Sequence, residues 1–450
     1  MANANTSRVL HREVRKVPPL AAKGDGVYFV DQAGRRYLDA CGGAAVSCLG
    51  HSDRTVIDAI KRQLDAFAFA HTGYFTADVL ETLAARLTGI VPGAFARASL
   101  YCGGSEAMEA ALKNARQYFV EKGETSRSKF IARRQSFHGN TLGTLSIGNH
   151  AVRSAPYLPY MFQVAHIAPC YLYRDKQDGE TEAQYALRVA NELEVEILRV
   201  GPENVAAFIA ETVTGATLGA APGAAGYFKR IREICDKYGV LLILDEVMSG
   251  SGRTGTWFAF EQEGIAPDIA VIAKGLGAGY QPIASVLLAP KIVEAMEDGS
   301  GAVAHSHTYM GHACGAAAAL AVLDVVEKQG LLANVRKRGQ QLRGIFDERF
   351  ANHPHIGDIR GRGLLMALEL VEDRATKKPF ERGGAIAAGI KAAALDLGLM
   401  VYPSSGTIDG RRGAHVLLAP PYVIDDSHVA EIADKLPVAI DRAIERHAKA

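Results

Sequence analysis

The 450-residue sequence lacks long apolar runs and lacks an excess of charge of either sign. No segment approaches the roughly 18 consecutive apolar residues of a membrane-spanning helix. The formal net charge is +1 at pH 7, which gives no electrostatic reason to expect binding to nucleic acid or to a membrane. Residues 1–20 are polar and basic, without the apolar centre of a secretory signal. We therefore expect a cytoplasmic protein.

Motifs for metal or nucleotide binding are also missing. The six cysteines have no CxxC spacing, so we expect reduced thiols rather than metal ligands. His305, His307 and His312 could supply metal ligands, but no HExxH pattern accompanies them, and we expect no metal site. The chain has no GxxxxGK[ST] sequence, which excludes a P-loop.

What the sequence does contain is a regular alternation of apolar runs of strand length with helical patterns. The helices are expected near 105–118, 225–238, 311–327 and 331–350, with a further strand at LLMALEL. This alternation predicts an α/β fold with a mainly parallel, doubly wound sheet. The apolar runs are ASLYC (98–102), KFIARR (129–134), VAAFIAE (205–211), LLILDE (241–246), IAVIA (269–273) and ASVLLA (284–289).

Two of these runs end in residues that carry chemistry. Asp245 ends LLILD, and Lys274 directly follows IAVIA in a glycine-rich turn. Open α/β sheets bind ligands at the carboxyl ends of their strands, so both side chains are expected at the site. A lysine beside a carboxylate indicates Schiff-base chemistry.

Further strings occur together with these two in a characteristic order: GGSEAMEAALKNARQY (103–118), SFHGNTLG (136–143) and HTYMGH (307–312). In this combination the chain resembles the class III aminotransferases that depend on pyridoxal phosphate (PLP), over about residues 26–424. The resemblance implies the fold-type-I architecture, with a large PLP-binding domain and a smaller α+β domain. We expect the large domain at 66–330 and the small one at 331–450, joined by an N-terminal segment, 1–65, that carries a substrate loop.

The resemblance also implies roles for the residues at the cofactor. Lys274 would hold PLP as a Schiff base and move the proton, and Asp245 would pair with the pyridine nitrogen. Phe137 occupies the position of the aromatic that stacks on the ring, with Val247 behind the opposite face. In our reading, Ser105 caps the following helix, whose N-terminus receives the phosphate. The full set of expected cofactor contacts is Gly104, Ser105, Phe137, His138, Glu211, Asp245, Val247, Lys274 and Thr308.

Thr308 carries a prediction about assembly. In the family, the corresponding threonine donates its hydroxyl to the PLP phosphate of the neighbouring subunit. The resemblance therefore implies a homodimer with shared active sites.

Substrate residues are less well defined. Ala216 stands where ornithine and 4-aminobutyrate enzymes have a glutamate that pairs with a switchable arginine. The matching arginine here is Arg411 or Arg412, and we prefer Arg412 because it directly precedes Gly413. The expected donor side of the pocket consists of the small residues Cys41 and Ala44 and the aromatic Tyr74.

The predicted reaction is the transfer of an amino group from a primary amine or ω-amino acid to a 2-oxo acid, preferably pyruvate, by a ping-pong mechanism. Alternatives within the family are 2-oxoglutarate-dependent transaminases, aminomutases and dialkylglycine decarboxylases. A remote alternative is an NAD-dependent dehydrogenase, because Gly250, Gly252 and Gly255 form a GxGxxG pattern and Asp268 follows at a suitable spacing. The segment after these glycines is too short for a Rossmann helix.

Overall fold

A computed structural model describes residues 7–449. Its centre is a seven-stranded sheet with the strand order β4-β12-β11-β10-β7-β5-β6. β10 is parallel to β11 and β7, and β5 is parallel to β7 and β6, whereas β12 is antiparallel to both of its neighbours. The strands are β4 (Arg97–Tyr101), β5 (Lys129–Arg133), β6 (Ala165–Ile167), β7 (Val205–Glu211), β10 (Leu241–Asp245), β11 (Ile269–Ile272) and β12 (Ala284–Leu288).

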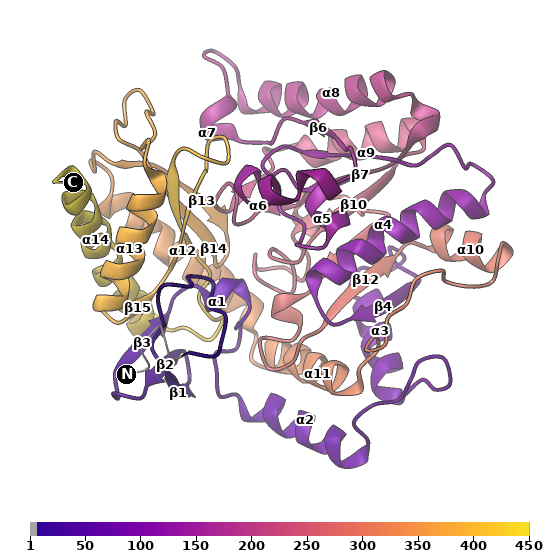
Figure 1. Cartoon of the computed structure of the whole chain (residues 1–450), viewed down its shortest axis with the longest axis horizontal. Helices are drawn as coiled ribbons and strands as arrows, with labels where there is room; N and C mark the ends of the chain where they lie inside the picture. Colours follow the sequence, from indigo (N-terminus) through magenta and orange to yellow (C-terminus); the bar gives the residue numbers. More distant parts are fainter. Residues whose placement is uncertain (1–6, 450) are drawn as a thin grey trace.

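Helices cover both faces of this sheet (Figure 1). Ile243 of β10 packs with the α4 side chains, while Leu242 and Leu244 pack with those of α8 and α9. Successive side chains of a strand point to opposite faces, so a strand buried on both faces must be apolar throughout, as LLIL is. The predicted α/β class is confirmed. The helices around the sheet are α3 (Asp78–Gly89), α4 (Gly104–Glu121), α5 (Leu142–Ile147), α6 (Ala151–Ser154), α7 (Leu172–Asp175), α8 (Glu182–Val200), α9 (Tyr227–Tyr238), α10 (Pro290–Asp298) and α11 (Ala313–Lys328).

The C-terminal part builds a second layer of sheet and helices. Its sheet has the order β13-β14-β17-β16 and is antiparallel throughout. Long helices pack beside it, on the yellow side of Figure 1. The elements are α12 (Leu331–Arg349), β13 (Ile356–Arg362), β14 (Leu365–Leu370), α13 (Gly383–Asp396), β16 (Tyr402–Ser405), β17 (Ala414–Leu418) and α14 (Asp426–Ala448).

The N-terminal segment joins this C-terminal part. β1 (Ala21–Asp25), β2 (Tyr28–Asp31) and β3 (Arg36–Asp39) form a sheet with β15 (Leu399–Met400), which runs parallel to β3. α1 (Gly42–Ala45) follows, and α2 (Arg54–Ala66) packs on α11. The division of the chain at residues 65 and 330 stays a prediction.

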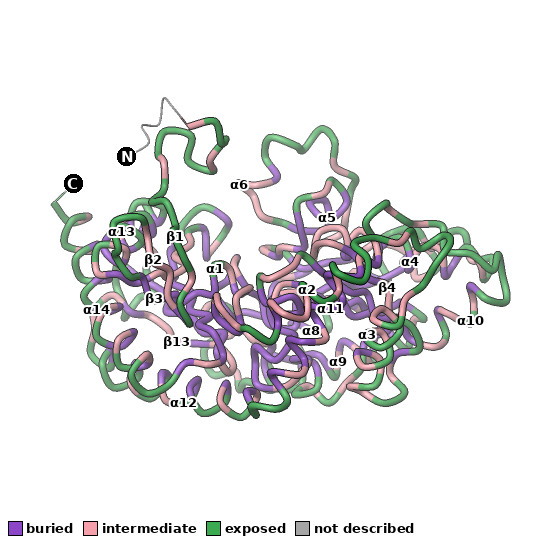
Figure 2. Tube along the Cα trace, turned by 90° about the horizontal axis from the view of Figure 1, so that it is seen from below, coloured by how far each residue is buried: buried purple, intermediate pink, exposed green. Residues whose placement is uncertain are grey.

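Burial follows the layered arrangement, with the buried trace inside and the exposed trace outside (Figure 2).

Short 3-10 helices and a two-stranded ribbon complete the secondary structure. No helix within residues 7–449 is both long and apolar enough to cross a membrane. The remaining elements are η1 (Ala155–Tyr160), η2 (Pro202–Asn204), η3 (Ala259–Glu263), η4 (Lys274–Leu276), β8 (Val213–Thr214) and β9 (Ala221–Pro222).

Candidate active site

Three neighbouring strands bring the candidate catalytic groups to one edge of the central sheet. Glu211 ends β7 and lies in register with Asp245, which ends β10. Asp245 is in turn paired with Val271 of β11, and Lys274 follows the end of that strand. Parallel strands present their carboxyl ends at the same edge, so the predicted meeting of Asp245 and Lys274 follows from the topology.

Lys274 has an unusual backbone and an unfavourable environment for charge. Its φ angle is +46°, in the left-handed region that a residue with a Cβ rarely adopts. Such strain persists only where the surrounding structure enforces it, and it is common at functional sites. Burial lowers the pKa of Lys274, and the nearby carboxylates of Asp245 and Glu211 only partly offset this effect. The amine is thus more easily deprotonated than an exposed lysine.

Asp245 is held from two sides. Nδ1 of the fully buried His138 lies 2.8 Å from Oδ2 of Asp245, and the backbone N–H of Val247 donates to Oδ1 at 3.0 Å. The other ring nitrogen of His138, Nε2, is buried and has no hydrogen-bond partner among residues 7–449. The carboxylate therefore has a fixed orientation.

Glu211 fixes the loop that carries Phe137. Its Oε1 accepts a hydrogen bond from the Phe137 backbone N–H at 3.1 Å, and its Oε2 accepts one from Gly215 N–H at 2.8 Å. Burial raises the pKa of Glu211, and the charge of Asp245 adds to that effect. Both oxygens are engaged with backbone donors, which gives Glu211 a structural position at the edge of the site.

The N-terminus of α4 forms a narrow cradle. A Cβ added to Gly104 would lie 3.0 Å from Cγ1 of Val247, so the valine would have to shift to admit a side chain there. Ser105 Oγ accepts a hydrogen bond from Asn140 N–H at 3.1 Å. The expectation that Ser105 caps α4 is wrong. Gly103 occupies the N-cap position without a side-chain cap bond, because the helix already begins at Gly104.

These groups face one cavity of about 410 Å³. All the expected cofactor contacts except Thr308 line it: Gly104, Ser105, Phe137, His138, Glu211, Asp245, Val247 and Lys274. Ala216 lines it too, so the cavity has no glutamate at that position. The sequence offered no pattern for several other lining residues, among them Val46, Arg153, Met248, Gln281, Ile283 and Tyr402.

Six expected residues lie elsewhere in the single chain. Cys41 is buried with its thiol 3.3 Å from Asp39 Oδ1, and Ala44 lies on the same turn without reaching the cavity lining. Arg412 donates from Nε to Asp409 Oδ2 at 2.8 Å, and Arg411 is exposed. Tyr74 is 82% exposed, and Thr308 is exposed as well.

The glycine pattern at 250–255 does not build a dinucleotide site. The segment after it contains only the 3-10 helix η3, in agreement with its short length. Asp268 accepts from the Leu242 backbone N–H at 2.7 Å and pairs with Arg232, so it serves the strand edge. In residues 7–449 no group of three or more His, Cys, Asp and Glu side chains is arranged to hold a metal ion.

Comparison with known proteins identifies the family. The sequence model of the family described as aminotransferase class-III matches residues 9–440. The chain belongs to the class III aminotransferases. An uncharacterized aminotransferase of Schizosaccharomyces pombe is 45% identical over 428 residues, covering 95% of this aminotransferase and 93% of the relative. The taurine–pyruvate aminotransferase of Bilophila wadsworthia is 34% identical over 431 residues, covering 95% and 92%.

Solved structures agree with this assignment. The PLP-bound amine transaminase from an uncultivated Pseudomonas species matches with a TM-score of 0.90 and 34% identity, covering 96% of this chain and 97% of that one. The fold is therefore that of the fold-type-I transaminases, and the aminotransferase depends on PLP.

The chain's own residues fit that cofactor. The cavity offers a lysine of lowered pKa, an oriented carboxylate and a helix N-terminus that favours an anion. Gly103 and Gly104 line the cavity without side chains, so a phosphate group can approach the backbone at the start of α4. PLP needs an amine for its aldehyde, a carboxylate for its ring nitrogen and an anion site for its phosphate, and these features would supply all three.

Proposed function

We propose that this aminotransferase moves an amino group from an ω-amino acid or primary amine to a 2-oxo acid, preferably pyruvate, by a ping-pong mechanism at a shared homodimeric site. The observation that carries the proposal is the convergence of Lys274, Asp245 and His138 on one cavity. PLP, when bound, supplies the carbonyl group that exchanges the amino group and the ring that withdraws electrons.

Lys274 has two roles in this proposal. It would anchor the cofactor covalently, and its neutral amine would take the proton from the substrate carbon that bears nitrogen. Burial favours that neutral form, because it lowers the pKa of Lys274. The left-handed backbone at Lys274 fixes the direction in which the side chain leaves the turn.

Asp245 would hold the ring nitrogen in its protonated form. A carboxylate close to a pyridine nitrogen raises the pKa of that nitrogen by roughly one to three units. His138 and the Val247 N–H keep the carboxylate oriented. Phe137 and Val247 lie on the lining of the same cavity and would pack on the two faces of the ring.

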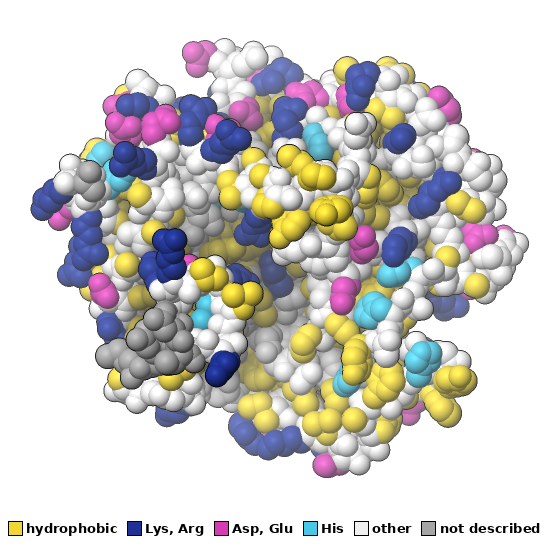
Figure 3. Space-filling view, viewed as in Figure 1, with side chains coloured by type: hydrophobic (Ala, Val, Ile, Leu, Met, Phe, Trp, Pro, Cys, Tyr) yellow, Lys and Arg dark blue, Asp and Glu magenta, His cyan; other side chains and the backbone are white. Residues whose placement is uncertain are grey.

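The proposed homodimer is supported by the exposed aromatic side chains of one surface. Hydrophobic side chains gather at the lower right of the face in Figure 3, in the region where Figure 1 places α2 and α11. Five aromatic side chains of the 67–75 segment and the 307–312 turn have exposed fractions of 38–82%: Phe67, Phe69, Tyr74, Phe75 and Tyr309. An exposed apolar patch of this kind typically marks a protein interface. Thr308 is next to Tyr309, which suits a role in the neighbouring subunit.

Pyruvate is the preferred acceptor for two reasons. Ala216 leaves the cavity without the glutamate of the ornithine and 4-aminobutyrate enzymes. The relative from Bilophila is named for pyruvate. 2-Oxoglutarate-dependent transamination, aminomutation and decarboxylation are the alternatives that the same cofactor residues would also serve.

The test separates cofactor attachment from transamination. Reduction of the purified enzyme with borohydride, followed by peptide mass spectrometry, should locate the cofactor on Lys274. In single-turnover spectra, an amine donor should convert the cofactor to its amino form, and pyruvate should restore it. Lys274→Ala should abolish both signals, while Lys229→Ala, at an exposed lysine, should retain them. Normal turnover by Lys274→Ala would refute the proposal.

A further inference from the structure

Arg153 is a cation in the active-site cavity that none of the sequence motifs indicated. It lies on the four-residue helix α6, and its side chain lines the cavity together with Lys274, Glu211 and Phe137. The guanidinium carbon lies 4.5 Å from the centroid of the Phe137 ring. Its positive charge is near enough to contribute to the lowered pKa of Lys274, after burial as the larger cause.

Within residues 7–449, the Arg153 guanidinium has no hydrogen-bond acceptor and no ion-pair partner. The two carboxylates of the cavity are engaged elsewhere: Asp245 with His138, and Glu211 with the backbone N–H groups of Phe137 and Gly215. Ala216, which also lines the cavity, carries no charge. Arg412, by contrast, is paired with Asp409. The cavity therefore presents one cation with nothing to neutralise it.

The surroundings hold Arg153 in place. The Phe137 ring lies against the guanidinium, and the loop at 406–413 packs on α6 at Ala151. A Cβ at Gly410, where φ is +79°, would lie 3.0 Å from the Ala151 Cβ, so helix and loop are in close contact. Gln135 Nε2 donates to the Thr407 carbonyl at 2.9 Å and ties the same loop to the segment that carries Phe137.

We propose that Arg153 binds the remote carboxylate of the amino donor and thereby makes ω-amino acids, rather than uncharged amines, the preferred donors. This inference rests on the proposed transamination and names the substrate class for it. An uncharged alkyl chain would displace water from the unpaired guanidinium without offering hydrogen-bond acceptors in its place, and this desolvation is unfavourable. A carboxylate instead forms a bidentate, charge-assisted pair with the guanidinium fork.

The experiment compares two donors of equal length on the PLP-loaded enzyme, 5-aminopentanoate and pentylamine, in single-turnover half-reactions. The wild type should favour 5-aminopentanoate. Arg153→Gln should lower the preference for 5-aminopentanoate, measured as the ratio of its efficiency to that of pentylamine, by roughly 10- to 100-fold, the scale of a lost hydrogen bond to a charged group. Arg134→Gln, at an exposed arginine outside the cavity lining, is the matched control and should change neither rate.

A binding measurement accompanies the kinetics. Calorimetric titration with pentanoate, an unreactive carboxylate, should give a dissociation constant that rises by the same factor in Arg153→Gln. Arg153→Lys keeps the charge but loses the fork, so its loss should be intermediate. This variant decides the matter if the glutamine variant folds poorly.

The outcomes separate the two proposals. If no amine converts the cofactor in the wild type, the proposed function fails. If amines react but Arg153→Gln slows both donors equally, or slows neither, the function stands and the role of Arg153 is refuted.

Discussion

Nδ1 of His138 lies 2.8 Å from Oδ2 of Asp245, and both side chains are buried. His138 lies in the segment that follows β5, whereas Asp245 ends β10. A buried carboxylate held by a histidine and a backbone N–H cannot rotate freely. The protein's own groups thus orient Asp245 for a cationic partner.

The first prediction concerns this carboxylate. Asp245→Asn keeps the shape of the side chain but removes the charge that would hold the ring nitrogen protonated. We expect PLP to remain bound in part, while the proton-transfer step slows by roughly 100-fold or more. Single-turnover absorbance with a fixed donor measures that step directly. An unchanged rate would contradict the electron-withdrawing role of the ring.

The second prediction tests the shared site. If Thr308 contacts the cofactor of the neighbouring subunit, each site takes its lysine from one chain and its threonine from the other. Mixing Lys274→Ala chains with Thr308→Ala chains would put both lesions in one site of each heterodimer and leave the other site intact. Activity should therefore exceed that of either parent.

Two controls belong to the mixing experiment. Thr308→Ala alone must be severely impaired, and the exchange of subunits must be verified with differently tagged chains. Mixed dimers that never exceed the parents would show that Thr308 acts within its own chain.

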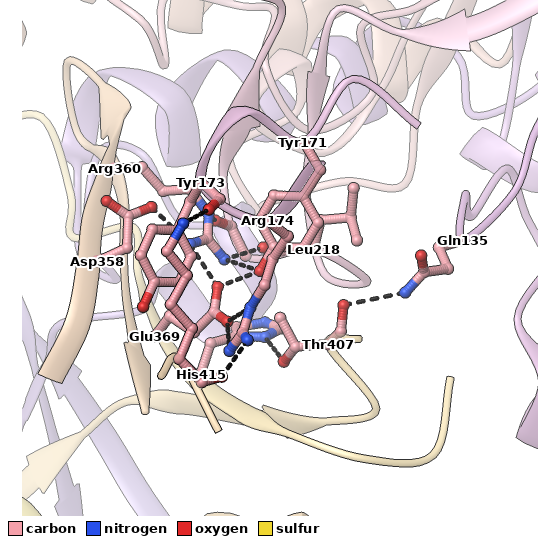
Figure 4. A network of polar contacts seen from close by, with 12 residues as sticks. Gln135, Tyr171, Tyr173, Arg174, Leu218, Asp358, Arg360, Glu369, Thr407 and His415 are labelled. Carbon is pink, nitrogen blue, oxygen red and sulfur yellow. Dashed lines mark hydrogen bonds and ion pairs between the residues drawn. The ribbon is translucent and has the colours of Figure 1, made fainter. Parts of the chain in front are cut away.

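The third prediction concerns a buried polar network between the central sheet and the C-terminal part (Figure 4). Arg360 donates from Nη1 to Glu369 at 2.7 Å and from Nε to the Gly219 carbonyl at 2.8 Å. Beside them, His415 Nδ1 lies 2.7 Å from the Thr407 hydroxyl. Burial lowers the pKa of His415 to about 3, and the charge of Arg360 adds to the effect.

This shift makes the fold sensitive to acid. Because the pKa of His415 is lower in the folded state than in the unfolded state, the unfolded state binds more protons between about pH 3 and 6.5. Stability present above pH 6.5 is therefore lost as the pH falls. With an ordinary histidine pKa of about 6.5 in the unfolded state, we expect the titration of His415 to lower the free energy of unfolding by about 2 kcal/mol between neutral pH and pH 5.

Denaturant unfolding of the holoenzyme at pH 7.5 and pH 5 measures this loss. His415→Gln lowers stability at both pH values because it disturbs a packed site, but it should reduce the difference between them. Equal differences in the variant and the wild type would mean that His415 does not contribute to the acid sensitivity.

The sequence predicted that Asp245 and Lys274 lie close together, and the structure places both on one cavity. Asp245 and Lys274 directly follow apolar runs, and the rule for parallel sheets brings such ends together. Helix ends were predicted less precisely. Serine is a favoured N-cap residue, which led to the prediction of Ser105, but α4 begins one residue earlier and its N-cap is Gly103.

Arg153 could not be predicted in the same way. It lies on a short helix with no periodic pattern, and only the folded contacts with Phe137 bring it to the cavity. The sequence also could not show which of the two neighbouring arginines, Arg411 or Arg412, pairs with Asp409. That pairing depends on the turn that the loop adopts in the folded chain.

The last prediction concerns Arg412, which we propose binds the α-carboxylate of the 2-oxo acid. In the structure its guanidinium is paired with Asp409, and the pair is partly exposed. The loop backbone is held by the close contact of Gly410 with Ala151, but the Arg412 side chain is about half exposed, so it can rotate about its own bonds. On this hypothesis Arg412 leaves Asp409 and turns toward the cavity when a 2-oxo acid binds.

Arg412→Ala should then weaken pyruvate use by roughly 1.5 to 3 kcal/mol, the scale of a hydrogen bond to a charged group. The half-reaction with a carboxylate-free amine should be nearly unchanged. Asp409→Asn, which weakens the resting pair, should make pyruvate use more efficient, because less free energy is spent on releasing the arginine. Half-reactions measured separately for Arg411→Ala and Arg412→Ala decide between the two arginines. Equal losses with amine and pyruvate, or no loss in either variant, would exclude a swinging arginine, because a side chain that turns inward only for the 2-oxo acid must affect that half-reaction alone.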